Sequence, residues 1–150
     1  MPRKLTSLEL YSQFCDSLQK FKPGSWTLAL FEGSPAEGLY SWCPDCVVMS
    51  THVRNLERDQ ERGGKPPSAK LLKFKVGSRR EWESKRKLNP FKAGFPHLSD
   101  VPTAILFFGR LDVFRVIAPR EADLRYMLER TKVYEDQVRS QDWHPPARAR

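Results

Sequence analysis

The stretch "SWCPDC", residues 41–46, decides the fold class, because it places two of the chain's three cysteines two residues apart. A mostly apolar run of strand length, residues 25–31, precedes this motif, and an apolar stripe with helical spacing follows it. The motif therefore connects a buried strand to the beginning of a helix. Cys43 is expected at the N-terminus of that helix, and Cys46 one turn further along.

The spacing of the two cysteines favours thiol-disulfide chemistry. Residues three apart share one face of a helix, so Cys43 and Cys46 can close a disulfide. Pro44 suits the first helical position, where its missing N–H costs nothing. The free N–H groups and the positive end of the helix dipole favour a thiolate at Cys43, whereas the carboxylate of Asp45 acts against it. We expect an accessible, reactive dithiol that is not strongly oxidising.

Two other interpretations of the pair remain open, a structural zinc half-site and inert thiols. Zinc needs four ligands in a closed site. The other candidate ligands lack ligand spacing; they are Cys15, His52, His97 and His144. We therefore expect no metal and no cofactor. Cys15 falls at a helical core position and is expected to be a small buried hydrophobe.

The totals describe a single domain. The chain has 150 residues, of which 39% are hydrophobic and 29% charged. No apolar run approaches the ~20 residues of a membrane span, and the basic N-terminus lacks the apolar stretch of a secretory signal. We expect a cytoplasmic protein without a membrane partner, in a compartment where stable structural disulfides are rare.

The periodicity predicts an alternation of helices and strands. Helices are expected at 7–20, from the Cys pair to about residue 56, at 80–88 and at 120–139, and strands at 25–31, 69–77, 103–109 and 110–118. A strand joined through a helix to the next implies a parallel pair, and the adjacent late strands imply an antiparallel hairpin. The expected class is α/β, with a mixed central sheet of about four to five strands flanked by helices.

The positive charge is concentrated in one segment. Residues 65–92 contain ten Lys and Arg against Glu81 and Glu83, an excess equal to the net charge of +8 of the whole chain. Such a segment is most often a solvated face, but it also suits an acidic substrate or protein partner. Nucleic acid is a less favoured partner: Trp82 and Phe91 lie among the charges, yet no RNA-binding motif accompanies them.

Three motifs together carry a resemblance to a known family. They are "SWCPDC", "KVGSRREW" at residues 75–82 and "VPT" at residues 101–103. The chain resembles the thioredoxin superfamily over about residues 22–130. Within it, the chain is similar to the Trp-Cys-Pro-Asp-Cys branch of proteins like thioredoxin domain-containing protein 17. The expected domain is 1–139, with a basic insert at about 57–100 and a disordered basic tail at 140–150.

The resemblance implies a thioredoxin fold and a set of site residues. Cys43 would be the nucleophile and Cys46 the resolving thiol, with Trp42 flanking the exposed sulfur. Pro102 would be a cis-proline opposite the pair, and the backbone of Val101 would offer hydrogen bonds to an extended substrate. The implied activity is reduction of small-molecule or protein disulfides, with a thioredoxin-reductase-type flavoenzyme as electron donor.

The sequence departs from the family pattern in two ways, which limits the properties that can be transferred from the family to this chain. Thioredoxins proper have a buried acid in the strand before the motif, and residues 25–31 contain none, so Asp45 or water would deprotonate Cys46. Residues 57–100 also look longer and more basic than their counterpart in the family. The alternative to an enzyme is therefore a redox-silent thioredoxin-fold module whose basic segment holds an acidic protein or nucleic acid.

Overall fold

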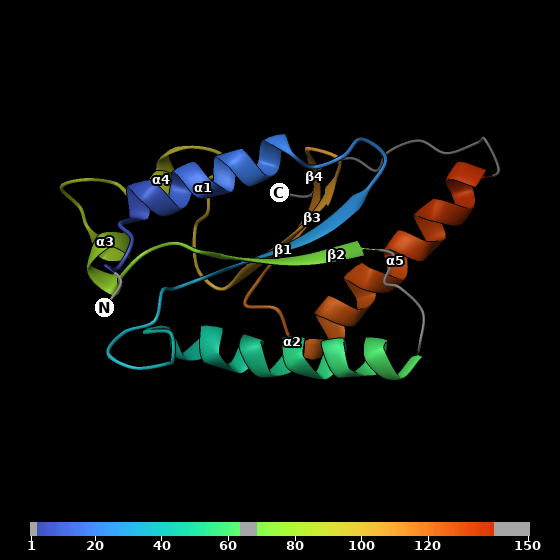
Figure 1. Cartoon of the computed structure of the whole chain (residues 1–150), viewed down its shortest axis with the longest axis horizontal. Coiled ribbons are helices and arrows are strands. Elements are labelled where there is room, and N and C mark those ends of the chain that lie inside the picture. Colours follow the sequence, from blue (N-terminus) through green and yellow to red (C-terminus); the bar gives the residue numbers. More distant parts are fainter. Residues whose placement is uncertain (1–2, 64–68, 140–150) are drawn as a thin grey trace.

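The computed structural model describes residues 3–63 and 69–139 and has helices on both faces of one sheet (Figure 1). In chain order the elements are α1 (Ser7–Gln19), β1 (Trp26–Glu32), α2 (Pro44–Gly63), β2 (Ala69–Lys75), α3 (Arg79–Glu83), α4 (Pro90–Ala93), β3 (Thr103–Phe108), β4 (Leu111–Ile117) and α5 (Glu121–Arg139). This order confirms the expected α/β class and thioredoxin fold. The expected disordered tail, 140–150, lies outside the described residues.

The sheet has four strands in the order β2-β1-β3-β4. β1 runs parallel to β2 and antiparallel to β3, and β4 runs antiparallel to β3, so the predicted parallel pair and hairpin are both confirmed. A parallel pair needs a crossover connection, which α2 supplies. The hairpin turns at Gly109, whose φ of 57° is a conformation that glycine adopts without strain.

The central position of β1 explains its composition. All seven of its residues are buried, because strands lie on both sides of it and helices cover both faces. The edge strand β2 instead carries two exposed lysines, Lys70 and Lys73, among mostly partly buried residues. Lysines on an edge strand also discourage pairing with another chain.

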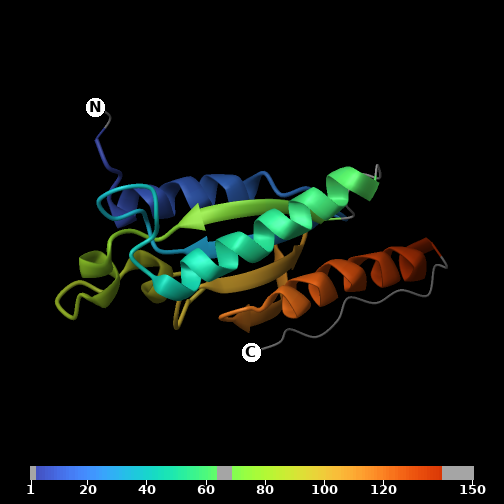
Figure 2. The same cartoon turned by 90° about the horizontal axis from the view of Figure 1, so that it is seen from below.

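Each face of the sheet has its own core. In Figures 1 and 2, α1 and α4 lie on one face, and α2 and α5 on the other. The first face carries an aromatic core of Phe14, Phe21, Ala29, Phe31, Cys43, Cys46, Val76, Trp82, Phe91, Leu98, Val101, Ile105 and Phe107. The second carries a mostly aliphatic core of Trp26, Leu28, Leu30, Met49, Val53, Leu56, Ala69, Ala104, Leu106, Val113, Leu124 and Met127. Both cysteines of the motif belong to the aromatic core.

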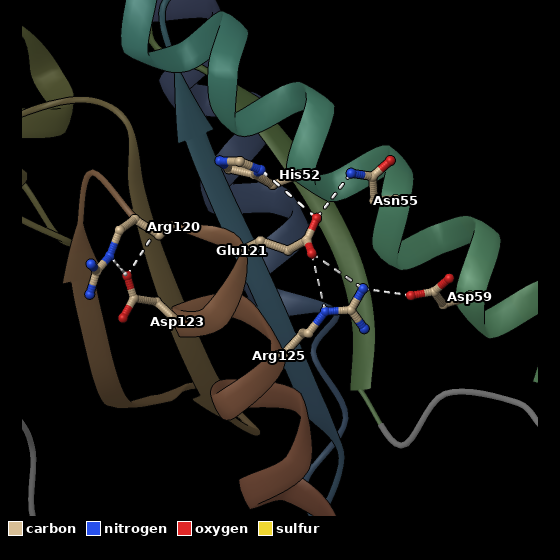
Figure 3. Close-up of polar contacts among 7 residues, drawn as sticks. All are labelled: His52, Asn55, Asp59, Arg120, Glu121, Asp123 and Arg125. Atoms are coloured by element: carbon tan, nitrogen blue, oxygen red, sulfur yellow. Dashed lines mark hydrogen bonds and ion pairs between the residues drawn. The ribbon is translucent and has the colours of Figure 1, made fainter.

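A polar network fastens α5 to α2 on the aliphatic side (Figure 3). At the start of α5, Glu121 accepts a hydrogen bond from Asn55 at 3.0 Å and lies 3.9 Å from Nδ1 of His52. Arg125, one turn later, bonds to Glu121 and to Asp59. The helix that begins at the Cys pair is therefore held by α5 as well as by the sheet.

Several boundaries differ from the sequence-based expectation. β1 includes Glu32, one residue beyond the predicted strand. α2 continues to Gly63, so the prediction that it ends at about residue 56 is wrong. α3 covers Arg79–Glu83, a shorter span than 80–88, and α4 was not predicted. The last turns of α2 together with β2, α3 and α4 lie within residues 57–100, the segment expected as a basic insert.

The described helices were also compared with the requirements of a membrane span. Within residues 3–63 and 69–139, none has the combination of length and apolar character needed to cross a bilayer.

Candidate active site

Cys43 caps the N-terminus of α2. Its carbonyl accepts hydrogen bonds from the N–H groups of Cys46 and Val47 at 3.1 and 3.2 Å. Its Sγ accepts a further bond from the Cys46 N–H at 3.2 Å, in the position where a Ser or Asp side chain usually caps a helix. Pro44 is the first helical residue, as predicted. The cysteine sulfur is thus the atom toward which the first turn of α2 directs an N–H group.

This placement puts the Cys43 sulfur at the N-terminus of α2. The N–H group of Cys46 and the positive end of the helix dipole are both directed at this atom. Asp45 lies in the first turn of α2 and is exposed, so water screens its carboxylate.

Cys46 is the more deeply buried thiol of the pair. Its side chain is fully buried, and burial raises the pKa of its thiol, as does a hydrogen bond to Cys43. The backbone N–H of Gly33 and the hydroxyl of Ser41 act in the other direction and lower that pKa. Burial therefore favours the neutral thiol of Cys46, and the Gly33 N–H and the Ser41 hydroxyl are donors that can stabilise its thiolate.

The segment expected to face the Cys pair lies against Cys43. The Val101–Pro102 peptide bond is cis, as the resemblance implies. The Cys43 thiol donates to the Val101 carbonyl, with 3.7 Å between Sγ and O, and the Val101 N–H donates to Oδ1 of Asp100 at 2.8 Å. Both backbone polar groups of Val101 already have partners. The Val101 carbonyl has a second lone pair and can still accept one further hydrogen bond.

The expected exposure of the nucleophile is wrong for the free chain. Cys43 is only 6% exposed and belongs to the aromatic core together with Val101, which lies 58 positions later in the sequence. The exposed apolar side chains nearest to it in sequence are Leu39 and Tyr40, at 90% and 69%. The loop before the motif therefore exposes apolar surface, whereas Cys43 itself is covered.

Trp42 is held in one orientation by the Val-Gly turn after β2. Its Nε1–H donates to the carbonyl of Gly77 at 2.9 Å, and the Gly77 N–H donates to Oγ of Ser34 at 3.0 Å. The indole lies against Gly33, where an added Cβ would come within 2.5 Å of Cε2. Gly77 has a φ of 112°, so both glycines are required here. Two of the sequence motifs meet at this indole.

Sequence reasoning missed Glu32. The prediction that the strand before the motif contains no buried acid is wrong, because β1 is one residue longer than expected and Glu32 is 2% exposed. Its carboxylate forms an ion pair with Lys75 and accepts a hydrogen bond from Ser50 at 3.3 Å. Ser50 lies one turn beyond Cys46 on α2. Lys75 compensates the buried charge, which is the usual condition for burying a carboxylate.

Sequence reasoning also missed Ser41. Its Oγ accepts a hydrogen bond from the Cys43 N–H at 3.2 Å, and its hydroxyl lowers the pKa of Cys46. One hydroxyl therefore contacts both cysteines of the motif. A serine two residues before a helix-capping cysteine was the only signal in the sequence, and serine there is equally typical of a loop.

The other candidate groups do not form a second site within the described residues. Within the described residues, no group of three or more His, Cys, Asp or Glu side chains is close enough together to hold a metal ion. Trp82 and Phe91, the aromatics of the basic segment, are buried in the aromatic core. Lys92 lies over the Trp82 ring, 4.3 Å from its centroid. Neither ring is available to stack on a base.

Comparisons with known proteins give the family and the fold. A family model described as the thioredoxin domain of thioredoxin domain-containing protein 17-like proteins matches residues 8–115. Thioredoxin domain-containing protein 17 of Epinephelus coioides and that of Danio rerio are each 32% identical over 97 residues, which is 65% of this chain and 72% of each relative. Thioredoxin O2 of Arabidopsis thaliana, in its oxidised state, superimposes with a TM-score of 0.53 at 18% identity, over 79% of this chain and 86% of that one.

Proposed function

The chain belongs to the thioredoxin domain-containing protein 17-like family of thioredoxin domains, and on that premise we propose that it reduces disulfides with the dithiol of Cys43 and Cys46. The family supports a function of the thiol-disulfide oxidoreductase type. The observation that carries the finer proposal is the hydrogen bond from the Cys46 N–H to Sγ of Cys43. It places a backbone N–H donor at the sulfur that has to carry negative charge in the reaction.

The reaction has two exchange steps. The Cys43 thiolate attacks one sulfur of the substrate disulfide, and the other sulfur leaves as a thiolate that takes a proton from water. Cys46 then loses its proton, attacks Sγ of Cys43 and displaces the second substrate thiolate. Two electrons pass to the substrate, and the protein retains a disulfide between Cys43 and Cys46. The Gly33 N–H and the Ser41 hydroxyl stabilise Cys46 as it ionises.

A catalytic cycle requires a reductant for the disulfide left on the protein. We propose a thioredoxin-reductase-type flavoenzyme as this donor and the cytoplasm as the location, because the activity needs a compartment that keeps dithiols reduced. The substrates would be small-molecule or protein disulfides.

The test is reduction of insulin or of a dithio dye, with dithiothreitol as the source of electrons. Cys43→Ser should abolish the reduction, and Cys46→Ser should permit only the first exchange. Cys15→Ser is the matched control, because this partly buried thiol of α1 lies outside the motif and should not affect the rate beyond any loss of stability. Equal activity of the wild type and the Cys43→Ser variant would contradict the proposal.

The low exposure of Cys43 favours a second candidate, a redox-silent module that binds an acidic partner through its basic segment. Such a module would retain its function in the Cys43→Ser variant. Its partner would dissociate in about 0.5 M salt, where attraction between exposed charges is screened. Disulfide reduction by the wild type, lost in the Cys43→Ser variant, separates the two candidates.

A further inference from the structure

A cavity of about 530 Å³ is lined by Trp42, the residue that precedes Cys43 in the chain. Lys4 and Leu5 line it from the N-terminal segment, residues 34–37 from the loop after β1, Trp42 from the motif, and residues 78–81 from the beginning of α3. Both views of the chain show these segments gathered at the same end of the molecule (Figures 1 and 2). We call this cavity the α3 groove.

The walls of the α3 groove are largely apolar. Leu5, Leu10, Pro35, Ala36 and Trp42 contribute most of this surface. Leu5 is 38% exposed, and Pro35 and Ala36 are also exposed, so apolar surface faces water in the free chain. Covering such surface with an apolar side chain is favourable in proportion to the area removed from water.

The rim of the α3 groove is positively charged. Four basic residues line it against two acids, Glu37 and Glu81. The Glu81 carboxylate already accepts bonds from the backbone N–H groups of Ser7 and Ser78, at 2.8 and 3.0 Å. Among the basic residues, Lys75 and Arg79 are paired within the chain, with Glu32 and Glu83 respectively.

The other two basic residues of the rim remain available. Lys4 and Arg80 are exposed and form no ion pair within the part of the chain that the structure describes. A carboxylate is the complementary group for these two cations. The occupant that fits the α3 groove therefore carries an apolar side chain and a carboxylate close together.

The position of Trp42 connects this groove to the reacting sulfur. Trp42 is the residue before Cys43 and forms a wall of the α3 groove, and its ring is fixed by Gly77. A substrate segment that continues from a disulfide held at Cys43 along Trp42 therefore enters the groove.

We propose that the α3 groove binds the segment of a peptide or protein substrate next to its disulfide, and that it selects an apolar residue followed by Asp or Glu. This inference rests on the proposed disulfide reduction for its biological meaning. The binding preference itself can be measured without any redox step, so the two proposals can fail separately.

The test uses the full chain with Cys43→Ser and Cys46→Ser, and fluorescein-labelled ten-residue peptides. Each peptide contains one S-methylthio-cysteine and, three residues away from it, either Leu-Glu or Leu-Gln. One pair of peptides has this dipeptide before the cysteine in the sequence, and a second pair has it after the cysteine. By fluorescence anisotropy, we expect the Leu-Glu peptide of one pair to bind roughly three- to tenfold tighter than its Leu-Gln partner. Replacing Leu by Ser should weaken both peptides, because the apolar wall then loses its contact.

Charge reversals then locate the site. Lys4→Glu combined with Arg80→Glu should remove the preference for Glu over Gln. Lys132→Glu, an exposed lysine on α5 outside the groove, should leave it unchanged. Equal binding of Leu-Glu and Leu-Gln peptides, or an equal loss of preference in Lys132→Glu, would overturn the proposal. The proposal would also be overturned if a single-stranded oligonucleotide bound more tightly than the acidic peptide, and if Lys4→Glu combined with Arg80→Glu abolished that binding.

Discussion

The two faces of the sheet hold their helices in different ways. On the face of α1 and α4, aromatic rings pack against one another. The ring centroid of Phe14 lies 5.3 Å from that of Phe31 and 5.0 Å from that of Phe74, and both pairs are edge to face. On the face of α2 and α5, aliphatic side chains fill the core, and a polar network at the surface ties the helices together. The Cys pair begins a helix of the second face but packs into the core of the first. The Cys pair thus lies at the boundary between the aromatic core and the aliphatic core.

The largest expected effect comes from removing one ring of the aromatic core. Phe14→Ala should lower the free energy of unfolding by about 3–5 kcal/mol, because a large buried side chain leaves a cavity. It should also speed alkylation of Cys46, which shares this core. Urea denaturation and mass spectrometry of iodoacetamide-treated protein, in conditions where the variant is folded, measure the two quantities.

The matched change on the other face is Leu28→Ala. Leu28 is fully buried in the aliphatic core, and its loss should cost about 2–5 kcal/mol. Alkylation of Cys46 in the folded variant should remain at the wild-type rate. If both variants speed alkylation equally, the two cores do not act separately on the site.

A smaller effect is expected for the buried acid beneath α2. Glu32→Gln removes the charge that compensates Lys75, but Lys75 is partly exposed and can turn to water. We expect a loss of roughly 1–3 kcal/mol in urea denaturation. The control is Glu57→Gln, whose ion pair with Lys73 is exposed and which should change stability by less than about 0.5 kcal/mol. Similar losses in both variants would show that burial of Glu32 contributes nothing.

The smallest expected effect is the pH dependence of the network between α2 and α5. The hydrogen bond from Asn55, followed by that from Arg125, holds the pKa of Glu121 below its usual 4.5. At acid pH the unfolded chain then binds more protons at this group than the folded chain. The stabilisation from Glu121 is therefore present above about pH 4.5 and is lost as the pH falls through the lowered folded value.

Urea midpoints between pH 6 and pH 3 test this sign. Glu121→Gln should lose less stability on acidification than the wild type does. Glu129→Gln, an exposed acid on the same helix, serves as the control and should behave as the wild type. If Glu121→Gln loses as much stability on acidification as the wild type does, Glu121 does not stabilise the contact between α2 and α5 through its charge.

The sequence was informative where the pattern is local. The helix predicted at 7–20 is α1, which begins with a capping box of Thr6 and Glu9, with reciprocal bonds at 3.2 Å. The apolar run of β1 and the placement of Cys43 at the helix start follow from short-range periodicity and from Pro44. These features depend on residues within a few positions of one another, so a single sequence contains them.

The errors arose where a polar residue belongs to a regular element. Glu32 ends a strand, but an acid after an apolar run has the pattern of a loop unless its distant partner Lys75 is known. The last two turns of α2, up to Gly63, are polar on all sides beyond Leu56, so no apolar stripe marks them.

The features of the site that could not be predicted are those built from distant segments. The cover over Cys43 comes from Val101, and the anchor of Trp42 comes from Gly77. The α3 groove joins the N-terminal segment, the loop after β1 and α3. No periodicity records which segments meet in space, and only the fold brings these together.

The central claim is that Cys43 attacks and that Cys46 resolves. The most direct measurement is mass spectrometry of the Cys46→Ser variant after incubation with a peptide that contains one disulfide. We predict a single peptide attached through a disulfide at Cys43, released by dithiothreitol, and no adduct in the variant that also carries Cys43→Ser. Absence of the adduct, or its attachment at Cys15, would contradict the account.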